Sequence, residues 1–312
     1  MIKSPIKIFV TGHNGMVGSS VLRKLKFYKN AKVYTAGRSV LDLRDQKKVE
    51  LFFKKNKFDA VINCAAMVGG IHYNNKNSGD FILNNLLIQN NIINSSFKNK
   101  IRNLIFLGSN CIYPKICKQP IKEEYLLSGT LEKTNEAYAV AKIAGVKLCE
   151  NLNYQYGLNY KCIMPPNLYG PGDNYDLNNS HFFPALIKKI YLAKLNNKNF
   201  IKIWGSGKPM RELMHVDDVA SACIFFLKKK TKHTIINIGN GKERSINGYA
   251  KFICKKLKVN LKFKYDKSKP DGTPRKINDI KIALSYGWKP KISLDEGFDS
   301  TFSDFLKRIK RK

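Results

Sequence analysis

The spacing of apolar residues in the first half of the chain predicts short strands that alternate with longer helices. Short, mostly apolar runs are bounded by polar or glycine-rich stretches, as in strands buried on both faces. Between them, apolar residues recur three and four positions apart, which is the period of a helix with one buried face. These rules predict strands at 6–11, 32–35, 60–63, 104–108 and 160–164, and helices at 16–28, 46–56, 80–97 and 137–156. Strands separated by helices form a parallel, doubly wound sheet, which binds ligands at the carboxyl ends of its strands.

The pattern changes after residue 164. Residues 165–174 are rich in proline, glycine and asparagine, which predicts a turn-rich loop. Shorter elements follow at about 182–195, 200–204, 216–229, 234–238, 246–257 and 293–309. We therefore predict an α/β fold with a Rossmann-type doubly wound parallel sheet in residues 1–165, to which 212–240 returns. Most of residues 166–312 should form a smaller C-terminal α/β substrate lobe.

The chain is strongly basic. Its 312 residues include 56 Lys and Arg but only 23 Asp and Glu, which gives a formal net charge of +33. Lysines are spread along the whole chain, which favours a solvated basic surface that attracts an anionic substrate. No recognised nucleic-acid-binding motif accompanies them, so we expect no nucleic-acid partner.

Apolar runs and cysteines exclude further classes of protein. No apolar run approaches the roughly 18 residues of a membrane span, and the first residues lack a signal-peptide pattern. We therefore expect a cytoplasmic protein without membrane contact. The seven cysteines are irregularly spaced and include no C-x-x-C pair, which predicts free thiols and no metal site.

A glycine-rich turn follows the first predicted strand. Gly12 permits a tight turn, Gly15 permits close backbone approach, and Gly18 lets the helix pack against the strand. The helix N-terminus then offers N–H groups to a pyrophosphate. The spacing G-x-x-G-x-x-G alone could also belong to a helix start that binds nothing. Its strand–turn–helix context predicts a dinucleotide site formed by Gly12, His13, Asn14, Gly15, Met16, Val17 and Gly18.

Residues 36–39, after the second predicted strand, indicate which dinucleotide binds. An acidic residue there would hold the ribose hydroxyls of NAD, but this chain has Arg38 and Ser39. A guanidinium can pair with a 2′-phosphate, and a serine hydroxyl can hydrogen-bond to it. Arg38 could instead stack on adenine or be solvated. We expect NADPH rather than NADH.

Tyr138 and Lys142 lie one helical turn apart, so they share one face of the predicted helix 137–156. A cation beside a phenol favours the phenolate, so we expect Lys142 to lower the pKa of Tyr138. Such a tyrosine can exchange a proton with a carbonyl or alcohol oxygen. Ser109, at the end of the fourth predicted strand, can hydrogen-bond to the same oxygen. Together with a dinucleotide site, these residues predict hydride transfer at an alcohol or sugar carbon.

With these motifs, the chain resembles the extended short-chain dehydrogenase/reductases and, among them, the GDP-L-fucose synthases. The resemblance covers nearly the whole chain. Its most specific segments are Ser-x-Cys-x-Tyr-Pro at 109–114, Asn-Ser-His at 179–181 and Lys-Pro-Asp-Gly-Thr-Pro-Arg at 269–275. Further matches lie at 12–18, 65–71, 135–145, 167–171, 204–207 and 211–218.

The resemblance implies a bifunctional oxidoreductase and isomerase (EC 1.1.1.271) that uses NADPH. Such enzymes epimerise GDP-4-keto-6-deoxy-D-mannose at C3 and C5 and then reduce it at C4 to GDP-L-fucose. The resemblance assigns the epimerase proton transfers to Cys111 and His181. Without it, Cys111 would be interpreted as an inert thiol and His181 as a loop hydrogen-bonding residue. A homodimer through helix 80–98 and the Tyr138 helix is also implied.

The resemblance implies two further sets of binding residues. The cofactor set adds Asp42, Leu43, Ala65, Ala66, Leu107, Gly108, Pro165, Asn167 and Leu168 to the glycine turn, Arg38, Ser109, Tyr138, Lys142 and His181. The substrate set is Lys189, Trp204, Arg211 and Asp271. Arg211 should bind the nucleotide diphosphate, because a guanidinium fork fits phosphate oxygens. Lys189 stands where relatives often carry arginine, so its diphosphate contact is open, and it could be a surface lysine.

Other functions remain open at this stage. A related nucleotide 4-keto-deoxy sugar, such as the GDP-colitose precursor, is the nearest alternative substrate. An NADPH-sensing protein without turnover would be expected to lack Tyr138 or Lys142, and both are present.

Overall fold

A six-stranded parallel sheet organises the molecule. The computed structural model describes residues 5–310. The sheet order is β2-β1-β3-β4-β5-β9, and every neighbouring pair is parallel. Its strands are β1 (Ile6–Thr11), β2 (Ala31–Tyr34), β3 (Ala60–Asn63), β4 (Asn103–Leu107), β5 (Asn159–Met164) and β9 (Ile235–Asn237). The predicted doubly wound α/β sheet is confirmed. The strand order reverses between β1 and β3, which is where such sheets open a ligand crevice.

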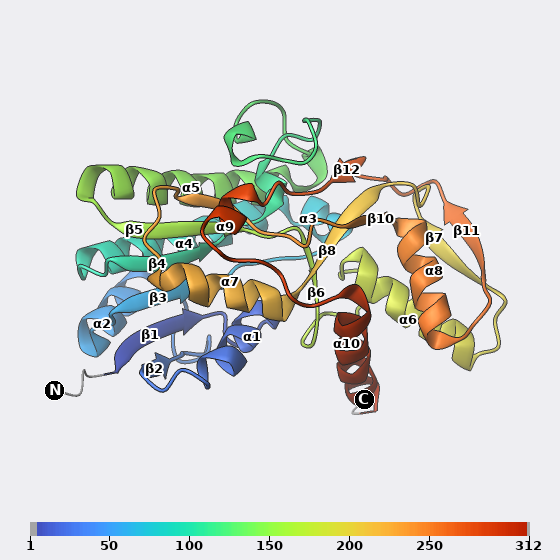
Figure 1. Ribbon diagram of the computed structural model, residues 1–312, viewed down its shortest axis with the longest axis horizontal. Coiled ribbons are helices and arrows are strands. Elements are labelled where there is room, and N and C mark those ends of the chain that lie inside the picture. Colours follow the sequence, from blue (N-terminus) through green and yellow to red (C-terminus); the bar gives the residue numbers. More distant parts are fainter. Residues whose placement is uncertain (1–4, 311–312) are drawn as a thin grey trace.

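Helices cover both faces of this sheet (Figure 1). One face carries α1 (Met16–Leu25) and α7 (Val216–Lys228), and the other carries α2 (Gln46–Asn56), α4 (Ser78–Lys98) and α5 (Glu136–Tyr156). Side chains of β1 alternate between the two faces. Ile8 and Val10 belong to the core beneath α1 and α7, whereas Phe9 packs edge-on against Phe53 of α2. The sheet is therefore buried on both faces, as its continuous apolar runs predict.

The rest of the chain builds a second lobe. In it, β8 (Met210–His215) pairs with β6 (Asn167–Tyr169), β10 (Glu243–Ser245) and β12 (Arg275–Lys276), while β7 (Phe200–Trp204) pairs with β11 (Lys262–Asp266). Three helices pack here: α6 (Phe182–Leu195), α8 (Ile246–Leu257) and α10 (Leu294–Ile309). Their buried side chains, among them Phe183, Tyr249 and Phe298, form a separate core.

Several short elements escaped the sequence prediction. They are the strands β8, β10, β11 and β12, the helices α3 (Ile71–Lys76) and α9 (Lys281–Ser285), and the 3-10 turns η1 (Asn110–Ile112), η2 (Glu123–Tyr125) and η3 (Lys133–Asn135). The prediction of a loop throughout 165–174 was wrong at β6. This strand exists because it pairs with β8, about 45 positions away, and no local pattern records that pairing.

The chain returns to the central sheet after entering the second lobe. Helix α7 packs on α1, and β9 extends the sheet beyond β5, whereas β8 belongs to the second lobe. The division at residue 165, with 212–240 returning, stays a prediction that α7 and β9 support. Within residues 5–310, no helix is long and apolar enough to cross a membrane. In the same range, no three His, Cys, Asp or Glu side chains are grouped to hold a metal ion.

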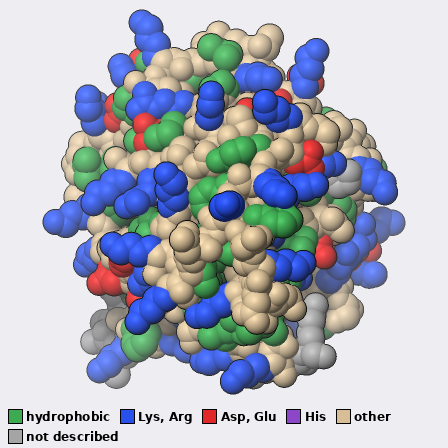
Figure 2. Space-filling model, turned by 90° about the vertical axis from the view of Figure 1, so that its right-hand side faces the viewer, with side chains coloured by type: hydrophobic (Ala, Val, Ile, Leu, Met, Phe, Trp, Pro, Cys, Tyr) green, Lys and Arg blue, Asp and Glu red, His purple; other side chains and the backbone are tan. Residues whose placement is uncertain are grey.

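Basic side chains dominate the surface. Figure 2 shows lysine and arginine spread over the face in view, with few acidic side chains between them. This agrees with the even spacing of lysine along the sequence.

Candidate active site

A cavity of about 910 Å³ opens at the carboxyl ends of the central strands. It runs from the glycine turn after β1 to Cys111 and Arg211, and so borders both lobes. Except for Ser39, all the residues predicted to bind the cofactor or to act in catalysis line it, and so does Arg211. Residues as far apart in the sequence as Gly12 and Lys276 therefore share one site.

The glycine turn has the geometry that its spacing predicts. Gly12 has a φ of 64°, and a Cβ there would lie 2.8 Å from the amide nitrogen of Ala65. Gly15 N–H donates to the Gly12 carbonyl at 2.9 Å, and a side chain at Gly18 would collide with that same carbonyl. Helix α1 begins without a side-chain cap, so its first amides remain available to a phosphate.

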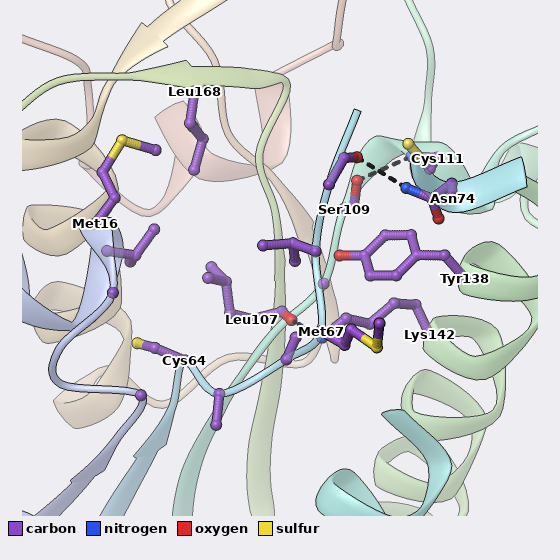
Figure 3. Close-up of a pocket in the computed structure, with 18 of the residues that line it drawn as sticks. Met16, Cys64, Met67, Asn74, Leu107, Ser109, Cys111, Tyr138, Lys142 and Leu168 are labelled. Carbon is purple, nitrogen blue, oxygen red and sulfur yellow. Dashed lines mark hydrogen bonds between the residues drawn. The ribbon is translucent and has the colours of Figure 1, made fainter. Parts of the chain in front are cut away.

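Ser109, Tyr138 and Lys142 meet where β4 ends beside α5 (Figure 3). The Ser109 hydroxyl accepts a hydrogen bond from the Cys111 amide at 3.2 Å and lies near the Tyr138 phenol. The Lys142 ammonium donates to the Leu107 carbonyl at 2.8 Å, and its nitrogen lies 5.8 Å from the centre of the Tyr138 ring. The predicted serine, tyrosine and lysine therefore come together at one end of the cavity.

The expected effect of Lys142 on Tyr138 was wrong. Burial raises the pKa of Tyr138 above its usual value, and the Ser109 hydroxyl opposes that rise only in part. Burial also lowers the pKa of Lys142, to about 8. The amine points at the Leu107 carbonyl rather than at the phenol oxygen, so the cation does not stabilise a phenolate. The Tyr138 phenol therefore keeps its proton at neutral pH.

Cys111 is surrounded by donors. Its sulfur accepts hydrogen bonds from the Asn135 amide at 3.3 Å and from the Lys276 ammonium at 3.5 Å, and the Arg211 guanidinium contributes a further nearby positive charge. The sequence reasoning assigned no role to Asn135 or Lys276. Their one signal was position: Asn135 begins the matching segment 135–145, and Lys276 directly follows the segment 269–275.

His181 lies on the same cavity, directly before α6. Its ring is open to the cavity, yet the protein atoms packed around it lower its pKa by desolvation. Among the described residues, none forms a hydrogen bond with this ring. The imidazole is thus free to exchange a proton with a ligand.

The predicted substrate residues divide into two groups. Arg211, on β8, lines the cavity and is 8% exposed, and its guanidinium donates to the Met210 and Asp271 carbonyls. Lys189, Trp204 and Asp271 lie outside the lining. The Lys189 ammonium stands 5.3 Å from the centre of the Trp204 ring, and the Asp271 carboxylate holds the backbone of Ser206 at 2.6 Å. These three form an adjoining group that Arg211 connects to the cavity.

Arg44 is a lining residue that the sequence reasoning missed. It stands at the β2 end of the cavity with Arg38 and Asp42, and its guanidinium forks onto the Asp42 carboxylate. This pairing holds the pKa of Asp42 well below its usual range. An arginine two positions after an aspartate carries no distinctive pattern, so only the fold reveals it.

Comparison with known proteins identifies the family. The profile of the NAD dependent epimerase/dehydratase family matches residues 8–239. The chain belongs to this family. It is also similar over almost its full length to proteins named GDP-L-fucose synthase, which confirms the resemblance seen in the motifs.

Several relatives of this epimerase/dehydratase chain are informative. It is 46% identical over 303 residues to the GDP-L-fucose synthase of Sinorhizobium fredii, covering 97% of this chain and 96% of that one. The GDP-L-fucose synthase of Escherichia coli (strain K12) is 44% identical, with 98% of each chain covered. The GDP-L-colitose synthase of Yersinia pseudotuberculosis is 40% identical, with 96% of this chain and 98% of that one covered.

Solved structures of similar chains show the same architecture. A GDP-6-OMe-4-keto-L-xylo-heptose reductase from Campylobacter jejuni superposes with a TM-score of 0.91 at 33% identity, covering 98% of this chain and 99% of that one. A GDP-L-fucose synthetase from Naegleria fowleri, bound to NADP, has a TM-score of 0.87 at 27% identity, covering 99% and 95%. The family fold therefore extends over the whole described chain.

Proposed function

We propose that this protein is a bifunctional 3,5-epimerase and NADPH-dependent 4-reductase that converts GDP-4-keto-6-deoxy-D-mannose to GDP-L-fucose (EC 1.1.1.271). The observation that carries the proposal is the cavity itself. Cys111 and His181 line the same space as Tyr138 and Ser109, so proton transfer at carbon and reduction of a carbonyl can occur on one bound sugar. Relatives named GDP-L-fucose synthase, about 45% identical over nearly the full length, support this assignment.

The residues present fit NADPH. The glycine turn and the uncapped start of α1 would hold the pyrophosphate, Arg38 would meet the 2′-phosphate, and Lys142 would reach the ribose beside Tyr138. When bound, the cofactor supplies the hydride. A similar chain from Naegleria fowleri is named as bound to NADP, which supports the same cofactor here.

Epimerisation needs acidic hydrogens and two proton-transfer groups. Hydrogens at C3 and C5 of a 4-keto sugar are acidic because the enolate places charge on the carbonyl oxygen. Tyr138 and Ser109 would donate hydrogen bonds to that oxygen and so stabilise the enolate. Cys111, among the cationic groups of Lys276 and Arg211, would remove a proton as the thiolate. His181 would return a proton on the other face of the ring.

Reduction then uses the same oxygen contacts. Ser109 and Tyr138 orient the C4 carbonyl, and Tyr138 transfers its proton to the oxygen as that oxygen gains charge. The raised pKa of Tyr138 keeps the phenol protonated until this moment. Arg211, at the far end of the cavity, would hold the diphosphate.

Incubation with GDP-4-keto-6-deoxy-D-mannose and NADPH tests the proposal. NMR of the purified product should show GDP-L-fucose formed in step with NADPH oxidation. A parallel reaction with the 3-deoxy analogue, the GDP-colitose precursor, tests the alternative that the Yersinia pseudotuberculosis relative raises. A clear preference for the 3-deoxy sugar would reverse the substrate assignment, and consumption of neither sugar would refute the function.

Substitution of Lys276 by methionine is expected to slow epimerisation selectively. Methionine removes the positive charge and hydrogen-bond donor that lie 3.5 Å from the Cys111 sulfur, so deuterium exchange at C3 and C5 in D₂O should fall about tenfold. Lys276→Arg, which keeps the charge, should retain most of the exchange. An exchange rate that is unchanged in Lys276→Met would show that this cation does not assist Cys111.

Two broader expectations also remain proposals. A homodimer through α4 and α5 is supported by exposed apolar side chains on both helices: Leu83, Leu87 and Val140. The cytoplasmic location expected from the sequence stays a prediction.

A further inference from the structure

The β2 end of the cavity contains an ion-pair network that the proposed function does not yet use. Asp42 lies between two arginines, and all three residues line the cavity. Arg44 donates from Nη2 to Asp42 Oδ2 at 2.6 Å and from Nε to Oδ1 at 3.0 Å. Arg38 Nε lies 3.8 Å from Oδ2, and the Arg38 side chain is 75% exposed. The carboxylate is therefore held by Arg44, and Arg38 is left open to the cavity.

Helix α4 fixes the Arg44 guanidinium from its other side. Arg44 Nη1 donates to the Asn84 side-chain oxygen at 2.9 Å, and the Asn84 amide in turn donates to the Asp80 carbonyl at 2.7 Å. Both Asn84 and Asp80 also line the cavity. The fork onto Asp42 is therefore preorganised by two different elements, the β2–α2 loop and α4.

The charge on Asp42 matters because of where it stands. Asp42 lies eight positions after β2 ends, but its carboxylate lines the same end of the cavity as Arg38. A free carboxylate there would repel a 2′-phosphate and can accept hydrogen bonds from the ribose diol of NADH. With Arg44 in place, that carboxylate is neutralised and the trio keeps one uncompensated positive charge. Without Arg44, Arg38 would be the remaining partner of Asp42 and would be drawn away from a phosphate.

We propose that Arg44 determines cofactor specificity: by neutralising Asp42, it leaves Arg38 free to bind the 2′-phosphate of NADPH. This role rests on the proposed use of NADPH. Arg44 acts mainly through Asp42 and Arg38, so it is a positioning residue, and the removal of Asp42 should compensate for its loss.

The test is to titrate NADPH and NADH into the protein without any sugar substrate and to measure binding by protein or cofactor fluorescence. Arg44→Met should raise the dissociation constant for NADPH about tenfold while leaving that for NADH unchanged or lower. Adding Asp42→Asn to Arg44→Met should restore most of the NADPH affinity. Arg23→Met is the matched control, because Arg23 pairs with Asp217 at 2.7 Å, is similarly exposed, and lies outside the cavity lining.

Each outcome is decisive. If the wild-type protein prefers NADPH and the Arg44→Met variant keeps that preference, the role of Arg44 is overturned and the cofactor proposal stands. If Arg44→Met weakens the binding of NADPH and NADH equally and Asp42→Asn does not restore it, the role of Arg44 is also overturned, because such losses indicate a structural role. Wild-type protein that binds NADH as tightly as NADPH overturns the cofactor proposal and this role with it. Should Arg44→Met not fold, Asp42→Asn alone must bind NADPH at least as tightly as wild type; weaker binding contradicts the inference.

Discussion

Replacement of Tyr138 by phenylalanine is expected to reduce the rate of ketone reduction by about 10²–10⁴-fold at saturating NADPH and sugar. In the proposed reaction the Tyr138 phenol, which lies beside Ser109, donates its proton to the C4 oxygen. The Lys142 ammonium donates to the Leu107 carbonyl and not to the phenol. Phenylalanine keeps the ring but removes the acidic proton. The loss of NADPH absorbance under steady-state conditions measures the effect.

Tyr73→Phe is a matched control for this substitution. Tyr73 lines the same cavity, and its ring packs edge-on against Phe81 at 5.5 Å, as the Tyr138 ring does at 6.4 Å. Both variants lose one hydroxyl from the same aromatic cluster, so a general packing effect would appear in both. A Tyr138→Phe enzyme that reduces the sugar within about threefold of the wild-type rate would rule out the phenol as the proton donor.

The parts of the site that depend on local geometry could be predicted from the sequence. The glycine turn is set by the positive φ at Gly12 and by the close approach of Gly18 to the Gly12 carbonyl, and both act within one strand–turn–helix unit. Tyr138 and Lys142 share a helix face because four residues make about one turn. Ser109 directly follows the predicted strand 104–108, because the apolar run that predicts this strand stops there. In each case the interacting groups are near in sequence or fixed by one element.

The contacts that tune the chemistry could not be predicted in this way. Lys276 reaches Cys111 across 165 positions, and Arg44 reaches Asn84 across 40, so both depend on how separate elements pack. The direction of Lys142 was also beyond local reasoning. Spacing puts its ammonium near Tyr138, but the buried amine needs an acceptor, and the Leu107 carbonyl at the end of β4 supplies it at 2.8 Å.

Replacement of Cys111 by serine is expected to abolish the formation of GDP-L-fucose while sparing some reduction of the unepimerised ketone. Serine nearly preserves the size of the side chain, but its hydroxyl is a far weaker acid than a thiol, so Lys276 and Asn135 can no longer favour an ionised base. Deuterium exchange at C3 and C5 in D₂O should fall by about 10²–10⁴-fold. NMR measures this exchange and, with NADPH added, identifies the sugar that is reduced.

Cys64→Ser separates this role from a general effect of losing a thiol in the cavity. Cys64 also lines the cavity, but burial raises its pKa to about 12, so it remains a thiol and cannot serve as the base. This variant should therefore exchange deuterium and form GDP-L-fucose at nearly wild-type rates. Wild-type exchange in Cys111→Ser would remove the epimerase assignment and leave a reductase. Loss of exchange together with continued slow reduction would place epimerisation on Cys111 and reduction on Tyr138, two chemistries sharing one carbonyl oxygen.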